Sequence, residues 1–165
     1  HFYYQKIQVF SRAKRWQLME VGRLHKILKT FDFVNTLIKE YENWYLLLRS
    51  DQVTLGSLVL IEKSFKNKYS EISSSSFTEF GEIIKKIEPT LNGLFSYEKI
   101  NYLMLMMKDD EVHYHIIPRY PKVRCFNSIE FIDSGWPLLP DMTFHNHLDS
   151  ETESKLIAAL KDSLQ

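Results

Sequence analysis

The sequence predicts an α+β fold in which an antiparallel sheet packs against helices. Two pairs of short apolar runs predict two β-hairpins: residues 44–48 with 58–61, and residues 100–107 with 112–117. Around these runs, apolar residues recur at the three-to-four spacing of a helix. Adjacent hairpins combined with separate helices are typical of an α+β domain whose helices lie against one face of the sheet.

Three helices are expected within this frame. The second begins at Ser76, where Glu79 completes the spacing of a capping box, and the third begins at Ser150 with Glu153 in the same role. The first is predicted over residues 31–42 from five apolar residues at helical spacing, Phe33, Val34, Leu37, Ile38 and Tyr41.

Length and composition indicate one globular domain. The 165 residues are 44% hydrophobic and 25% charged, with a formal net charge of zero, so no overall charge calls for a nucleic-acid partner. The single cysteine, Cys125, cannot form an internal disulfide, which fits the reducing cytoplasm. No run approaches the roughly 20 apolar residues of a membrane span. We therefore expect a cytoplasmic protein without a membrane span.

The first 30 residues differ from the remainder in charge. They hold seven Lys and Arg residues and one acid, Glu20. Three interpretations stay open: a basic amphipathic helix packed beside the domain, an organelle-targeting segment, or a fragment boundary, since the chain begins at His1. The predicted organisation is a basic N-terminal extension over residues 1–30 and one domain over residues 31–165.

The segment most informative about chemistry runs from Glu111 to Arg119 (EVHYHIIPR). Alternate side chains of a strand share a face, so Glu111, His113 and His115 should point one way, at steps of about 6.5–7 Å. The apolar residues between them should face the core. One side of this strand therefore presents two imidazoles and a carboxylate.

Three interpretations of this row are possible. It can be a surface row without function. It can be a metal site, as in cupins that use a His-x-His start, with a distant fourth ligand such as His145 or His147; the helices predicted here count against a cupin. It can also support nucleotidyl transfer, in which one imidazole attacks phosphorus and the other holds phosphoryl oxygens and assists the leaving group. The row alone does not decide which of the two histidines is the nucleophile.

The sequence resembles the histidine triad family over residues 31–165. Residues 113–119 (HYHIIPR) resemble the end of the family's His-φ-His-φ-His-φ-φ motif, where φ is apolar. Residues 55–63 (LGSLVLIEK) resemble the family's proline–glycine–histidine strand opening. Residues 101–106 (NYLMLM) and 135–137 (GWP) resemble segments of a bacterial branch of the family. The resemblance implies a five-stranded antiparallel sheet with packed helices, a homodimer, a small nucleotide as substrate, and no metal or other cofactor.

The resemblance also implies roles for individual residues. His113 matches the nucleophile, and His115 matches the histidine that contacts phosphate and supports the leaving group. Because this position is histidine rather than glutamine, the resemblance favours hydrolysis of a nucleoside phosphoanhydride or phosphoramidate through a nucleotidyl-histidine intermediate. The candidate nucleotide contacts are Arg49, Gly56, Ser57, Met107 and Arg119.

Three positions depart from the family pattern. Glu111 stands where the first histidine is expected, and we expect it to orient His113 through a hydrogen bond. Met107 replaces an expected asparagine, and Ser57 stands where many members have histidine. These departures keep a second interpretation open, in which the protein binds nucleotides with weak or no turnover.

Overall fold

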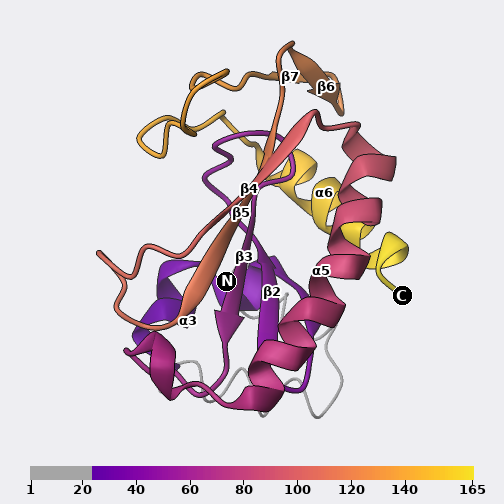
Figure 1. Cartoon of the computed structure of the whole chain (residues 1–165). Coiled ribbons are helices and arrows are strands. Elements are labelled where there is room, and N and C mark those ends of the chain that lie inside the picture. Colours follow the sequence, from indigo (N-terminus) through magenta and orange to yellow (C-terminus); the bar gives the residue numbers. More distant parts are fainter. Residues whose placement is uncertain (1–23) are drawn as a thin grey trace, which may run out of the picture.

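The computed structural model describes residues 24–165, and it has the predicted α+β fold, a five-stranded antiparallel sheet with helices (Figure 1). The strand order is β1-β2-β3-β5-β4, and each neighbouring pair runs antiparallel. The sheet strands are β1 (Leu37–Glu40), β2 (Trp44–Leu48), β3 (Leu58–Glu62), β4 (Lys99–Leu103) and β5 (His113–Arg119). The other elements are α3 (Lys26–Thr30), α4 (Phe33–Thr36), η2 (Tyr69–Glu71), α5 (Ser74–Phe95), the small hairpin β6 (Arg124–Phe126) and β7 (Ile129–Phe131), and α6 (Ser150–Ser163).

Both predicted hairpins are present. Strands β2 and β3 pair from Trp44↔Glu62 to Leu48↔Leu58, and β4 pairs with β5. Strand β5 also pairs with β3, so it is an interior strand with a hydrogen-bonded neighbour on each side. The two histidines of interest therefore lie on an interior strand of the sheet.

The main core fills the space between one face of the sheet and the two long helices, α5 and α6, which lie on the same side in Figure 1. Tyr114 and Ile116 of β5 point into this core. The largest side chains that are fully buried here include Trp44, Leu46, Leu58, Leu60, Ile83, Ile87, Leu91 and Phe131.

A second, smaller core covers the opposite face, so the prediction of helices on one face only was wrong. Ile27 and Leu28 of α3 pack there against Leu47, Val59 and Ile61 of the sheet. Residues 24–30, assigned to the extension by sequence, thus contact the domain directly. Residues 1–23, which hold most of that basic stretch, lie outside the described residues.

The predicted helix over residues 31–42 was also wrong. Residues 33–36 form the short α4, and residues 37–40 form the edge strand β1. Leu37 packs in the second core whereas Ile38 packs in the main core. A strand between two cores buries side chains on both of its faces, so apolar residues stand next to each other in the sequence. This spacing was mistaken for one face of a helix.

Both predicted helix starts need correction. Helix α5 begins at Ser74, because the Ser73 hydroxyl accepts from the Ser76 amide at 3.1 Å. Glu79 instead accepts from the backbone amides of Glu42 and Asn43, at 3.0 and 2.7 Å, and so fixes the β1–β2 turn. Helix α6 is capped by the residue before the predicted one, Asp149. In both helices the residue just before the first helical residue provides the cap, in place of the predicted capping box.

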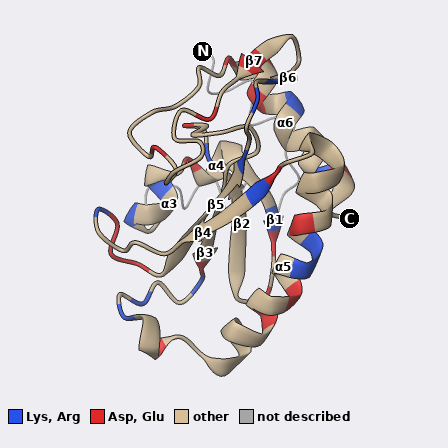
Figure 2. Ribbon diagram, turned by 45° about the horizontal axis from the view of Figure 1, so that its top comes forward, with Lys and Arg blue, Asp and Glu red and all other residues tan. Residues whose placement is uncertain are grey.

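Charged residues lie mostly in the loops and along the outward side of α5, while β2 and β3 carry few (Figure 2). Among residues 24–165, no helix is long and apolar enough to cross a membrane.

Candidate functional site

Strand β5 places His113 and His115 on the face of the sheet opposite to α5 and α6. In the strand register, His113 lies beside Ile61 and His115 beside Val59. Because Tyr114 turns into the main core, the two imidazoles share the other face, 5.0 Å apart between ring centroids and nearly perpendicular at 81°. This separation brings both rings within reach of one phosphate group.

The hydrogen bonding of His113 defines its tautomer. Its Nδ1 lies 2.6 Å from the backbone oxygen of Glu111. A carbonyl oxygen can only accept, so Nδ1 must carry the hydrogen. In the neutral ring, Nε2 is then unprotonated and holds a free lone pair. The arrangement therefore leaves Nε2 of His113 in the unprotonated form that an imidazole needs in order to act as a nucleophile.

His115 is neutral around pH 7. Burial lowers its pKa to about 3, and the neighbouring charges of His113 and Arg49 lower it in the same direction. Its Nδ1 is buried and has no hydrogen-bond partner among the described residues. His115, the expected phosphate contact, is therefore a neutral imidazole at this pH.

Phe31, in the turn between α3 and α4, lies over both histidines. The ring of Phe31 lies 5.9 Å from each imidazole, measured between centroids. His113 is only 2% exposed and His115 only 8%. Phe31 is therefore part of the wall of the candidate site.

The side chain of Glu111 contacts a third histidine that sequence reasoning missed. His25 Nδ1 lies 2.8 Å from Glu111 Oε1, and its ring stacks in parallel on Phe65 at 4.5 Å. No spacing pattern links residue 25 to residue 111, so nothing in the sequence indicates this contact. The carboxylate expected to act on His113 acts on His25, and His113 is held by the backbone carbonyl of the same residue.

Arg49 lies on the same side of the sheet as His115, whose pKa its charge depresses. Its backbone amide donates to Ser57 O at 3.0 Å, which continues the β2–β3 pairing. The guanidinium donates through Nη1 to Asp51 O, while Nε is buried without a partner among residues 24–165. Arg49 thus has a buried donor without a partner among the described residues, and its charge is near enough to His115 to lower the pKa of that imidazole.

Gly56 and Ser57 are engaged in the loop that precedes β3. Gly56 has φ +83°, and a Cβ there would lie 2.8 Å from the Phe95 ring, so glycine is required for both conformation and space. Ser57 is fully buried, and its hydroxyl donates to Thr54 O at 2.8 Å. The structure thus gives both residues a role in shaping the loop.

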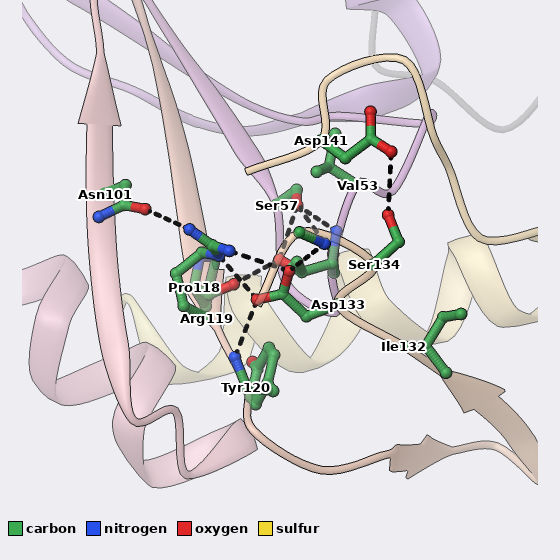
Figure 3. A network of polar contacts seen from close by, with 12 residues as sticks. Val53, Ser57, Asn101, Pro118, Arg119, Tyr120, Ile132, Asp133, Ser134 and Asp141 are labelled. Carbon is green, nitrogen blue, oxygen red and sulfur yellow. Dashed lines mark hydrogen bonds and ion pairs between the residues drawn. The ribbon is translucent and has the colours of Figure 1, made fainter. Parts of the chain in front are cut away.

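The last two candidates lie apart from the histidines. Met107 is 82% exposed in the loop between β4 and β5. Arg119 is buried at the end of β5, where Nε and Nη2 donate to Asp133 at 2.6 and 3.1 Å and Nη1 donates to Asn101 at 2.8 Å (Figure 3). Asp133 also accepts from the Tyr120 amide. Through these bonds Arg119 ties the loop after β7 to the sheet.

Within residues 24–165, no three His, Cys, Asp or Glu side chains converge with metal-binding geometry.

Comparison with solved structures shows which fold this is. The chain has the fold of the histidine triad proteins. It aligns with a histidine triad protein of Bradyrhizobium japonicum at a TM-score of 0.66 and 19% identity, over 86% of this chain and 97% of that one. A histidine triad protein of Marinobacter aquaeolei gives 0.67 and 19%, over 86% and 94%. The diadenosine triphosphate hydrolase of Plasmodium falciparum gives 0.56 and 13%, over 78% and 75%.

No protein-family model matches the sequence, and no curated protein does either.

Proposed function

We propose that this chain, which has the histidine triad fold, is a nucleotide-binding member of that family. We further propose that it hydrolyses a nucleoside phosphoanhydride or phosphoramidate through a nucleotidyl-His113 intermediate. The observation that carries the proposal is the bond from His113 Nδ1 to the Glu111 carbonyl, which leaves Nε2 unprotonated beside a second imidazole. The hydrolase activity named for the structurally similar Plasmodium protein supports the reaction class.

The first step is attack of His113 Nε2 on the phosphorus atom that carries the nucleoside. A P–N bond forms as the bond from phosphorus to the leaving atom breaks; a phosphate leaving group departs as an anion, and an amine leaving group takes up a proton from solvent. His115, 5.0 Å away, is placed to donate its N–H to the phosphoryl oxygens or to the leaving group. Water then attacks the same phosphorus, the P–N bond breaks, and a nucleoside monophosphate is released with regeneration of neutral His113.

Arg49 supports the anionic part of the substrate. Its Nε is a buried donor without a partner among the described residues, and such a group is costly to leave unpaired. A phosphoryl oxygen beside His115 would satisfy it and neutralise the charge that depresses the His115 pKa. Binding and electrostatic stabilisation would therefore come from the same guanidinium.

The alternative is a protein that binds nucleotides without turning them over. The specific observation in its favour is that His115, with a pKa of about 3, is a neutral and weak proton donor at pH 7. Phe31 must also move aside to admit a substrate, since both histidines are buried beside it.

One experiment separates the two. The purified protein is incubated with a dinucleoside polyphosphate and, separately, with a nucleoside phosphoramidate, and release of mononucleotide is followed. Single-turnover samples are analysed by intact-mass spectrometry for a nucleotidyl adduct. His113→Ala should abolish adduct and turnover while keeping nucleotide affinity within about tenfold, because a nucleophile contributes mainly to the transition state.

His145→Ala is the matched control, because His145 is an exposed histidine in the loop before α6. Full turnover in the His113→Ala variant would overturn the proposed mechanism. Nucleotide binding without release in wild-type protein would favour the binding function.

We also propose a homodimer. Strand β4 lies at the edge of the sheet, and among residues 24–165 it pairs only with β5, so its outer backbone groups are open to a partner strand. Sedimentation at micromolar concentration should give twice the chain mass, and a monomer would remove this proposal.

A further inference from the structure

We infer that His25 is a positioning residue for His113, acting through Glu111, so that a third imidazole reaches the site from outside the strand. The inference rests on the proposed role of His113 as nucleophile. Its basis is a chain of two short contacts, from His25 Nδ1 to Glu111 Oε1 at 2.8 Å and from the Glu111 carbonyl to His113 Nδ1 at 2.6 Å.

Glu111 needs an anchor because it precedes the strand. Strand β5 begins at His113, so the peptide of Glu111 is outside the regular ladder. Val112 is fixed on both sides, since its amide donates to Lys66 O at 2.9 Å and its carbonyl accepts from the Glu62 amide at 3.1 Å. Among residues 24–165, the polar contacts of Glu111 itself are the two named above. The Glu111 carbonyl lies in the same peptide plane as the Val112 amide, so the bond to Lys66 O restrains one end of that plane, and the side-chain contact with His25 restrains the residue at its other end.

His25 is itself held in place from two directions. Its ring stacks on Phe65 with an interplanar angle of 1°. Its carbonyl accepts from the amides of Leu28 and Lys29 at 3.0 and 3.3 Å, which ties it to the start of α3. Leu28 is buried in the second core, so α3 cannot shift freely. The imidazole consequently presents Nδ1 to a carboxylate that is only 10% exposed.

The consequence concerns the tautomer of His113. As long as the Glu111 carbonyl accepts from Nδ1, the neutral ring keeps Nε2 free to attack. If the Glu111 peptide rotates away, the hydrogen can move to Nε2, and that nitrogen can no longer act as a nucleophile. Removing the His25 contact should therefore lower kcat by about tenfold, in the range seen when a group that orients a functional histidine is lost. KM should change much less, because on this inference His25 acts on the orientation of the nucleophile and not on substrate binding.

The test uses four variants of the full chain. His25→Ala removes ring and donor, and His25→Phe keeps an aromatic ring on Phe65 but removes the donor. His25→Asn restores an amide nitrogen near the position of Nδ1, and His145→Ala is the control at an exposed histidine. Each protein is labelled with ¹⁵N-histidine, and long-range ¹H–¹⁵N spectra report which nitrogen of His113 is protonated. Turnover is measured in parallel.

We expect His113 to be protonated at Nδ1 in wild-type protein, in His25→Asn and in His145→Ala. It should shift toward protonation at Nε2 in His25→Phe and His25→Ala. The His25→Phe variant keeps the packing of α3, so it reports on the hydrogen bond even if His25→Ala does not fold.

An unchanged Nδ1 tautomer in His25→Phe would overturn the inference and leave His25 as an anchor for α3 alone. The tautomer is observed without any turnover. A tautomer shift in a protein that hydrolyses nothing would therefore support the positioning role and count only against the proposed reaction.

Discussion

Acidification should destabilise this protein in a way that depends on one buried imidazole, His115. Its pKa is about 3 in the folded chain and about 6.5 in the unfolded chain. Between these values the unfolded state binds a proton that the folded state does not, so the free energy of unfolding falls as pH falls. The destabilisation caused by His115 is therefore absent above about pH 6.5 and grows progressively as the pH falls toward 3.

The size of the effect follows from the two pKa values. Each pH unit below the unfolded pKa costs about 1.4 kcal/mol, so lowering the pH from 7 to 5 should cost about 2 kcal/mol from His115 alone. This figure is insensitive to the folded pKa as long as it lies below about 4, because protonation in the folded state then contributes almost nothing at pH 5. Against a typical total stability of about 5–15 kcal/mol, the loss is readily measured.

The assay is urea unfolding of wild-type protein and of His115→Gln at pH 7 and pH 5. The other titrating groups are common to both proteins, so the difference between their pH responses isolates His115. We expect the wild type to lose about 2 kcal/mol more than the variant, and His145→Gln to respond like the wild type. Parallel losses in wild type and His115→Gln would show that His115 is not held neutral by burial.

Two further predictions concern the surroundings of the site. Asp133→Asn should cost about 3–5 kcal/mol of unfolding free energy in urea, because it leaves the buried guanidinium of Arg119 without its counter-charge, and a loss below about 1 kcal/mol would contradict this assignment. Phe31→Ala should speed modification of His113 and His115 by diethyl pyrocarbonate severalfold, with exposed His145 as the internal standard; equal rates in variant and wild type would mean that Phe31 does not cover the imidazoles.

The sequence predicted those parts of the fold that depend on local pattern. The apolar runs at residues 44–48 and 58–61 became β2 and β3 because a short polar link between two such runs leaves an antiparallel hairpin as the simplest pairing. The strand at His113 was likewise visible from its alternation. The prediction of a helix over residues 31–42 was wrong because its apolar spacing comes from a strand that packs between two cores. The second core could not be known before α3 was placed on the sheet.

The candidate site was predictable only in part, for the same reason. The facing pair of imidazoles is a property of one strand, so local sequence is sufficient to place it. The contact from His25 spans the chain from α3 to β5, and the ion pair of Arg119 depends on where the loop carrying Asp133 returns to the sheet. Such contacts are set by tertiary packing, and a single sequence carries no periodic signal for them.

Glu111 shows why the identity of a side chain can mislead about its role. From the sequence, we expected its carboxylate to replace an orienting imidazole. In the structure the atom bonded to His113 is the backbone carbonyl, which every residue possesses. Replacement of histidine by glutamate at this position therefore does not by itself remove the bond that sets the His113 tautomer. What the carboxylate adds is a contact to His25, through which, by our inference, a segment 86 residues earlier in the chain helps to hold the carbonyl in place.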